Sequence, residues 1–171
     1  GDIRSGTDRI AFVTQSLSDC DTVINVQGDE PLIDPLIIDQ TAAPVLSDQT
    51  IPVATPVRRI ETVDELLNPN TTKVVIDNRQ NCLYFSRSPI PYCRDAAEGQ
   101  WPHLQAYYKH IGLYVFTREF LLEYAAMPRT PLEQAEKLEQ LRILEHGFRI
   151  KGVLTRYDSV PVDTPADLER V

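Results

Sequence analysis

Short apolar runs rich in β-branched residues alternate with stretches of helical periodicity along this chain, and this alternation limits its fold more than any other feature. The clearest run is Thr-Val-Ile-Asn-Val at 22–26, which stops at Gln-Gly-Asp-Glu-Pro at 27–31 because glycine and proline oppose its continuation. The clearest helical stretch is 131–146, which begins with a proline and is followed by Gly147. Strands that alternate with helices predict an α/β sheet.

The same signals place the other elements. We expect further strands at 51–57, 73–77, 82–86, 106–116 and 148–154, and further helices from residue 5 and at 35–43, 118–126 and 165–171. Residues 78–81 join two strands in a hairpin, and Pro44 is expected to end the second helix. The prediction is one domain over residues 1–171, with a mixed, mostly parallel sheet flanked by helices.

Composition limits the partners. The formal net charge of -8 argues against nucleic acid, which attracts basic surfaces, and no apolar run approaches the roughly 20 residues that span a bilayer, so no membrane partner is expected. Cys20, Cys82 and Cys93 have no zinc or redox spacing, and the chain does not begin like a signal peptide. Free thiols fit a cytoplasmic protein.

Two acidic residues stand where expected strands give way to helices. In an open α/β sheet, ligands bind beyond the carboxyl ends of the strands, and Asp29 follows such an end. Asp163 precedes the helix that Pro165 begins, so it is either a helix cap or a second ligand. Carboxylates that converge there suit Mg²⁺, whose other ligands are waters and phosphates. The alternative for Asp29 is an acidic turn that only ends a strand.

Three more side chains have two readings each. With a helical rotation of about 100° per residue, Glu139 falls in the apolar stripe of 131–146. Its carboxylate therefore needs either a substrate or a partner in a core ion pair, such as Arg142. Arg87 follows a strand and precedes a proline-rich loop, and it is either a ligand-binding fork or a surface residue. His110 lies inside an apolar strand, as a core histidine or a catalytic one.

Several common site motifs are missing from this sequence. Its glycines form no glycine-rich phosphate loop, and no Gly-Lys-Ser/Thr occurs. The histidines at 103, 110 and 146 have no metal-ligand spacing, which argues against zinc.

Five stretches, with a sixth that closes the pattern, resemble the 3-deoxy-manno-octulosonate cytidylyltransferases, also called CMP-Kdo synthetases. They run through the chain in the family's order: Ser-Gly-Thr-Asp-Arg at 5–9, Asn-Val-Gln-Gly-Asp-Glu-Pro at 25–31, Leu-Tyr-Phe-Ser-Arg at 83–87, His-Ile-Gly-Leu-Tyr at 110–114, Leu-Glu-Gln-Leu-Arg at 138–142 and Val-Asp-Thr-Pro-Ala-Asp-Leu at 162–168. Each stretch alone is weak, but the ordered set is specific.

The resemblance implies a cytoplasmic homodimer with a glycosyltransferase-A-like nucleotidyltransferase fold. Such enzymes join CTP and Kdo into CMP-Kdo and pyrophosphate, for lipopolysaccharide or capsule. By matching position, it implies catalytic magnesium ligands (Asp29 and Asp163), residues around the sugar acid (Gln27, Arg87, His110, Glu139 and Gln140) and residues near the cytidine (Ser5, Gly6 and Arg9).

One departure from the family pattern is large. The family begins with a strand and a Pro-Ala-Arg…Ser-Arg-Leu-Pro-Gly-Lys loop whose cations hold the triphosphate, and nothing of that kind occurs here. The fold is therefore expected to be incomplete at its N-terminus, and the chain alone to be inactive. Two other functions stay open: transfer of CMP to another acid sugar such as a sialic acid, and a non-catalytic remnant that dimerises or binds sugar.

Overall fold

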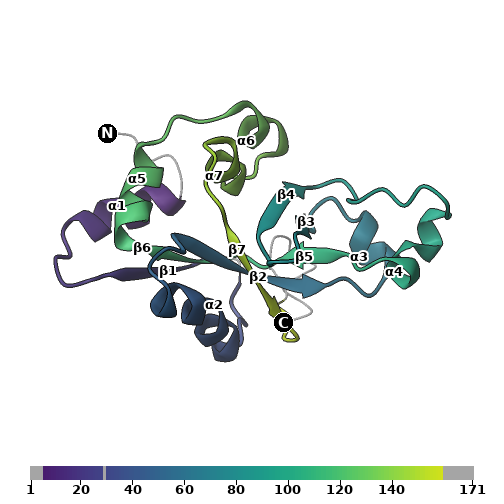
Figure 1. The fold of residues 1–171 in the computed structure, drawn as a ribbon, viewed down its shortest axis with the longest axis horizontal. Coiled ribbons are helices and arrows are strands. Elements are labelled where there is room, and N and C mark those ends of the chain that lie inside the picture. The colour runs from purple at the N-terminus through teal and green to yellow at the C-terminus, as the bar shows by residue number, and fades with distance from the viewer. Residues whose placement is uncertain (1–5, 29, 160–171) are drawn as a thin grey trace.

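The structure is a computed structural model that describes residues 6–28 and 30–159. A single sheet forms its centre (Figure 1). Its strands are β1 (Thr22–Val26), β2 (Val53–Arg59), β3 (Lys73–Ile76), β4 (Cys82–Ser86), β5 (Tyr108–His110), β6 (Leu113–Thr117) and β7 (Lys151–Thr155). The helices are α1 (Gly6–Gln15), α2 (Pro35–Ser47), α3 (Val63–Leu67), α4 (Trp101–Leu104), α5 (Arg118–Ala126), α6 (Pro131–Glu136) and α7 (Gln140–Glu145), with a 3-10 turn η1 (Glu98–Gln100) before α4.

The sheet is mixed but mostly antiparallel, so the expectation of a mostly parallel sheet is wrong. Its order is β1-β6-β2-β5-β3-β4, with β7 paired to β2 as the only parallel pair among the described strands. The α2 crossover does connect two strands that run the same way, β1 and β2. However, β6 lies between them and is antiparallel to both, because the chain returns through the middle of the sheet.

One long strand expected at 106–116 is broken at its centre. β5 and β6 lie end to end along β2, with residues 111 and 112 between them. At the break the Gly112 N–H donates to Glu30 Oε1 at 3.1 Å, and the Leu113 N–H folds back to the Ile111 carbonyl at 2.7 Å. The ladder is interrupted because a side chain, and not a neighbouring strand, takes the Gly112 amide.

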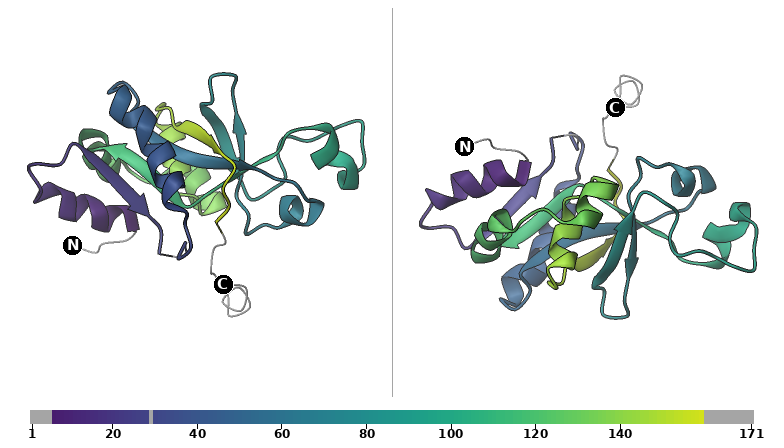
Figure 2. Two further views of the ribbon diagram at one scale, coloured as in Figure 1. Left: turned by 90° about the horizontal axis from the view of Figure 1, so that it is seen from below. Right: turned by 90° about the horizontal axis from the view of Figure 1, so that it is seen from above.

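Helices cover both faces of the sheet and bury its core. Figures 1 and 2 show α2 on one face, with α5, α6 and α7 on the other and α1 beside α5. The larger core cluster includes Val57, Phe85, Phe116 and Leu141, and a smaller one lies under α2. No helix in residues 6–28 and 30–159 is long and apolar enough to cross a membrane.

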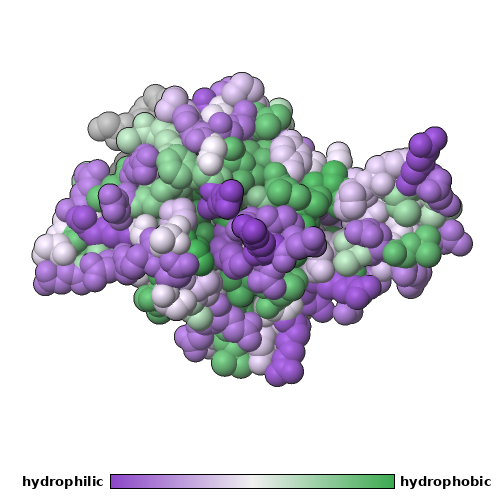
Figure 3. Space-filling view, viewed as in Figure 1, coloured by the Kyte–Doolittle hydropathy of each residue, from purple (hydrophilic) through white to green (hydrophobic). Residues whose placement is uncertain are grey.

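Part of the chain projects from this body as a lobe. It contains α3, η1 and α4 beyond the outer ends of β2, β3 and β5 (Figures 1 and 2), with a small core around Trp101 and Tyr107. In the space-filling view, hydrophobic residues gather around α6 and α7 and towards β3 and β4, where a narrower neck joins body and lobe (Figure 3). The hairpin expected from strands at 73–77 and 82–86 is present as β3 and β4, and it forms one side of this neck (Figure 1).

Two expected helices have different ends. Pro44 lies inside α2, which continues to Ser47, so one proline does not stop this helix. The helix expected at 131–146 is two short helices, because Lys137 adopts left-handed backbone angles with φ 56°. The strand and helix at 22–26 and 118–126 agree with expectation, and the helix at 165–171 lies outside the described residues.

A buried ion pair folds α7 against α6. Arg142 donates from Nε to Glu133 Oε2 at 2.8 Å and from Nη2 to Oε1 at 2.5 Å, with both side chains almost fully buried. Its guanidinium also lies 4.9 Å from the centre of the Tyr124 ring. The pair fixes the bend that carries residues 137–139, and Arg142 therefore does not pair with Glu139.

Removing Arg142 should be costly because it leaves the Glu133 carboxylate buried without its partner. We expect Arg142→Leu to lower the free energy of unfolding by about 3–5 kcal/mol, measured by urea unfolding. The control is Arg129→Leu, whose Nε lies 3.9 Å from the same carboxylate but whose side chain is 48% exposed. That change should cost less than about 1 kcal/mol. Equal losses in the two variants would contradict this account.

Candidate active site

The break between β5 and β6 opens a gap in the sheet. β1 and β3 lie on the same side of the β5–β6 line, so the carboxyl end of β1 points at the amino end of β3. The Gln27 N–H donates to the Gly112 carbonyl at 3.0 Å on one side, and the His110 N–H donates to the Thr72 carbonyl at 2.9 Å on the other. Side chains from both strand ends therefore face one cleft.

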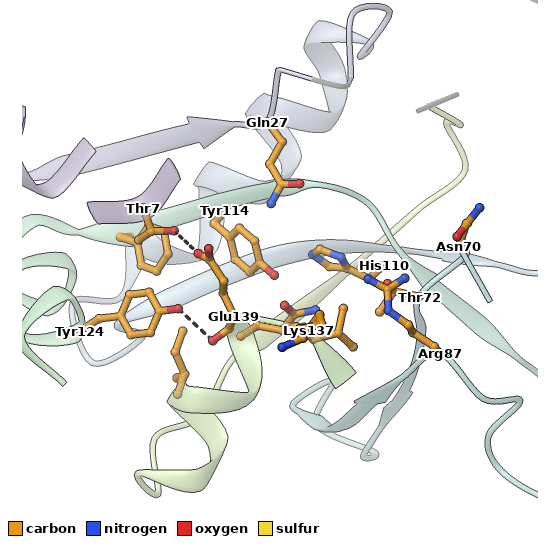
Figure 4. Close-up of a pocket in the computed structure, with 14 residues that line it drawn as sticks. Thr7, Gln27, Asn70, Thr72, Arg87, His110, Tyr114, Tyr124, Lys137 and Glu139 are labelled. Atoms are coloured by element: carbon orange, nitrogen blue, oxygen red, sulfur yellow. Dashed lines mark hydrogen bonds between the residues drawn. The ribbon is translucent and has the colours of Figure 1, made fainter. Parts of the chain in front are cut away.

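The main cavity in this cleft has a volume of about 450 Å³. Polar side chains from several segments of the chain line it, and Figure 4 shows most of them pointing into a common space: Thr7, Gln27, Asn70, Thr72, Arg87, His110, Tyr114, Tyr124, Lys137, Glu139 and Gln140. All five residues assigned to the sugar acid by resemblance are among them. The structure thus brings these five together, although it does not test their roles.

Glu139 reaches the cavity from the bend between α6 and α7. Its Oε2 accepts a hydrogen bond from Thr7 Oγ at 2.9 Å, and its carbonyl accepts one from the Tyr124 hydroxyl at 2.8 Å (Figure 4). The inward direction of Glu139 was predicted from one continuous helix, which the structure does not contain. The Glu139 carboxylate nevertheless points inward. Within the described residues Oε1 has no partner, so it can accept from a ligand.

Arg87 is half-buried and held in place by main-chain carbonyls. Its Nε donates to the Glu136 carbonyl at 2.9 Å and its Nη1 to the Pro69 carbonyl at 3.1 Å. Its own N–H donates to the Glu136 carboxylate at 3.0 Å. Nη2 has no partner in the part of the chain that the structure describes. A fixed guanidinium with free donors suits a carboxylate or phosphate group.

His110 is a neutral side chain at the back of the cavity. Its Nε2 lies 2.9 Å from Thr55 Oγ, whose hydroxyl donates to the Leu113 carbonyl at 2.7 Å. The Thr55 hydroxyl oxygen therefore accepts a hydrogen bond from the Nε2–H of His110. This places the imidazole proton on Nε2 and leaves Nδ1 as an acceptor. Phe85 and Tyr114 pack on the ring, and burial lowers the pKa of His110 to about 3.

A second hollow of about 430 Å³ adjoins the first along α1 and the end of β1. Its lining includes Gly6 and Arg9, the described residues that the resemblance assigns to the cytidine. Thr7, Gln27 and Glu139 line both hollows, so they stand at the boundary between them. The arrangement suits two ligands that meet at this boundary.

Glu30 ties three distant segments together beside the cleft. While Oε1 accepts from the Gly112 amide, Oε2 accepts a short hydrogen bond from Ser159, beyond β7. Asp158 forms ion pairs with Arg58 at 3.2 Å and Lys109 at 2.7 Å. The segment that follows β7 is thereby held against the loop that follows β1.

The remaining site predictions fall outside the described residues. Asp29 and Asp163, the expected metal ligands, and Ser5 are not among residues 6–28 and 30–159. Within those residues no group of three His, Cys, Asp or Glu side chains could hold a metal ion.

Sequence reasoning missed several residues that line the cavity. Asn70 and Thr72 precede a strand, and strand beginnings are not where ligands are expected in an open α/β sheet. Only the gap in the sheet brings them opposite Gln27. Tyr114 and Tyr124 lie among apolar neighbours and resemble core residues until the cavity is seen.

Comparison with known proteins gives this geometry a family. The family model described as cytidylyltransferase matches residues 1–150. The 3-deoxy-manno-octulosonate cytidylyltransferase of Geobacter metallireducens is 50% identical over 98% of this chain and 67% of its own length. That of Geotalea uraniireducens is 51% identical over 98% of this chain and 68% of its own length.

Solved structures agree. A CMP:2-keto-3-deoxy-manno-octonic acid synthetase complexed with CTP has a TM-score of 0.88 and 42% identity, over 99% of this chain and 67% of its own. HddC from Yersinia pseudotuberculosis, complexed with GMP-PN, has a TM-score of 0.61 at 11% identity over 99% of this chain and 61% of its own, which shows the fold alone. The α/β nucleotidyltransferase fold is therefore confirmed.

The chain belongs to the cytidylyltransferase family. Within this family it groups with the 3-deoxy-manno-octulosonate cytidylyltransferases, as its six motifs predicted. It spans about two thirds of the length of these relatives.

His110 should stay neutral where free histidines titrate. With its pKa lowered from 6.5 to about 3, we expect the ring nitrogen shifts of His110 to stay constant from about pH 8 down to about pH 5. The unfolded chain binds the extra proton between those two pKa values, so stability falls as the pH drops through that window. Nitrogen-15 NMR checks the first expectation, with His110→Gln to assign the signal. A midpoint near 6.5 would contradict it.

Proposed function

We propose that this chain carries the sugar-binding part and much of the nucleotide-binding part of an enzyme that transfers CMP from CTP to Kdo. The products are CMP-Kdo and pyrophosphate. The observation that carries the proposal is the pair of adjoining hollows, which share Thr7, Gln27 and Glu139. A neighbour of 42% identity, whose title names CTP, supports the nucleotide assignment.

The chemistry needs two substrates that meet at one boundary. The anomeric hydroxyl oxygen of Kdo forms a bond to the α-phosphorus of CTP. The bond from that phosphorus to the β-phosphate oxygen breaks, pyrophosphate leaves with the electron pair, and the hydroxyl proton passes to solvent. The residues described here position the reactants, and positioning alone supplies a large part of such a rate.

Four of the cavity residues are assigned roles in sugar binding. Arg87 presents its free Nη2 to the Kdo carboxylate, and Glu139 accepts from sugar hydroxyls through Oε1. Gln140, in the first turn of α7, reads further hydroxyls, and neutral His110 accepts one at Nδ1. On the other side of the boundary, Gly6 and Arg9 face the cytidine, with Ser5 assigned there by resemblance.

A magnesium ion completes the proposal, with Asp29 and Asp163 as its ligands. Carboxylate oxygens and phosphate oxygens are the donors that Mg²⁺ prefers. The ion would supply screening of the phosphate charge. The support is indirect: Glu30, which follows Asp29 in the sequence, accepts from Ser159, which precedes Asp163 by four residues in the sequence.

The wider setting is also proposed by resemblance. The enzyme is a cytoplasmic homodimer that supplies lipopolysaccharide or capsule synthesis, and the three free thiols fit a reducing compartment. The rival sugar is another acid sugar such as a sialic acid. The rival class is a protein that binds sugar or dimerises without catalysis. A substrate panel and turnover by the full-length protein that contains this sequence distinguish the three.

The sugar assignment predicts a separation of Michaelis constants. Arg87→Lys keeps the charge but loses the planar fork, and Glu139→Gln turns a charged acceptor into a neutral one. Each change should weaken Kdo use by about 1–3 kcal/mol in the full-length protein. The Michaelis constant for CTP should hardly change. A rise in the CTP constant alone, with the Kdo constant unaltered, would place these residues at the nucleotide instead.

The metal assignment predicts loss of rate without loss of folding. Asp29→Asn and Asp163→Asn should each lower turnover by about a hundredfold or more, since each removes a main source of charge stabilisation. Circular dichroism and thermal unfolding monitor the fold, and Asp48→Asn, an exposed cap residue, is the matched control. A variant that keeps a near-normal rate at low Mg²⁺ would show that its residue is not a metal ligand.

A further inference from the structure

Lys73, the first residue of β3, is a fully buried lysine next to the cavity. None of its side-chain surface is exposed, which is rare for a lysine without a carboxylate partner. Among the described residues no carboxylate lies within ion-pair distance of its Nζ. Instead, Nζ donates to the Asn68 carbonyl at 2.8 Å and to the Thr71 carbonyl at 2.6 Å. Both acceptors belong to residues 68–72, the loop between α3 and β3.

This 68–72 loop forms one wall of the cavity. Asn70 and Thr72 line both the main cavity and the smaller hollow beside Glu30. Arg87 holds the same loop through the Pro69 carbonyl. Three main-chain carbonyls of the loop are therefore turned towards two cations, and Figure 4 shows Asn70, Thr72 and Arg87 together at one end of the cavity.

Lys73 shares one nearby carboxylate with a second cation. Arg87, after β4, is a second cation, and Glu136, at the end of α6, is the nearby anion, whose carboxylate accepts from Ser86 and the Arg87 amide. On β5 the neighbour in register is Lys109, whose ammonium is held by Glu65 and Asp158. Lys73 and Arg87 thus have the single carboxylate of Glu136 close to them, whereas Lys109 has two carboxylates of its own. Burial, and then the charge of Arg87, lower the pKa of Lys73 to about 8 against the influence of Glu136.

A neutral donor could tie the loop at lower cost, because burying an ammonium group without a carboxylate is unfavourable. We propose that Lys73 is a positioning residue for acid-sugar binding, which fixes the 68–72 loop as the cavity wall and supplies positive charge behind Arg87. An anionic substrate would supply a second negative charge beside Lys73 and Arg87. The inference rests on the proposed function, since it takes the anion to be the carboxylate of the acid sugar.

The test compares two lysine variants of the full-length protein. Lys73→Met keeps the length of the side chain but removes its donors and charge. Lys151→Met is the matched control, because Lys151 Nζ also donates to a loop carbonyl, that of Arg79, at 2.6 Å, at the other end of the β3–β4 hairpin. We expect Lys73→Met to raise the Michaelis constant for Kdo at least about tenfold, equivalent to ~1.4 kcal/mol. The constant for CTP and the turnover number should stay within about twofold, and Lys151→Met should change none of them.

A pH profile separates this role from a merely structural one. In the unsubstituted protein the Michaelis constant for Kdo should rise as the pH increases through about 8, because the lowered pKa of Lys73 means that its ammonium group loses its proton there. Lys73→Met should lack this rise. A flat profile in the unsubstituted protein, or equal changes in the Kdo and CTP constants of the Lys73 variant, would overturn the proposal.

Hydrogen exchange tests the loop itself, independently of turnover. The Thr71 amide bonds the Asn68 carbonyl, which Lys73 also holds. We expect Lys73→Met to reduce the protection of the Thr71 amide against exchange by about tenfold or more. Unchanged protection would contradict the proposal that Lys73 holds the 68–72 loop. If the unsubstituted protein forms no CMP-Kdo, the proposed function fails, while hydrogen exchange still decides whether Lys73 holds the loop.

Discussion

The hydrogen bond from the Gly112 amide to Glu30 is the contact on which the rest of the site depends. It takes one amide out of the sheet, which divides a single strand into β5 and β6. Because β1 pairs with one half and β3 with the other, their ends face each other across a gap. Gly112 fits closely here, since a Cβ would lie 3.0 Å from Gln27 Oε1 and 3.2 Å from Glu30 Oε1 and would require both side chains to shift. The cavity exists because the sheet is interrupted at this point.

The sequence was informative where local signals decide the structure. Short apolar runs with β-branched residues and turn residues located β1, β4 and the β3–β4 hairpin, and the motifs located five residues that do converge on the cavity. It failed where distant residues decide. Nothing near Ile111 shows that Glu30 will capture the next amide, and nothing near Lys137 shows that Arg142 will fold back onto Glu133. The mostly parallel sheet was wrong for the same reason, since the return of β6 between β1 and β2 is a long-range event.

Two arginines illustrate how burial and partner number divide structural from functional roles. Arg142 donates to one buried carboxylate and packs on Tyr124, so its guanidinium stabilises the fold and does not face a ligand. Arg87 gives Nε and Nη1 to main-chain carbonyls and keeps Nη2 towards the cavity. Its orientation is fixed before a ligand arrives, which reduces the entropy lost on binding.

The gap in the sheet has a consequence for how specificity can evolve. The amides at the break are already bonded within the protein: His110 to Thr72, Ile111 to Pro56 and Gly112 to Glu30. A ligand therefore meets side chains and has no missing strand to replace. Exchanging those side chains can change the ligand that is accepted without disturbing the pairing of the strands. Because the strand pairing is complete without a ligand, the fold can be conserved while the side chains that contact the ligand change.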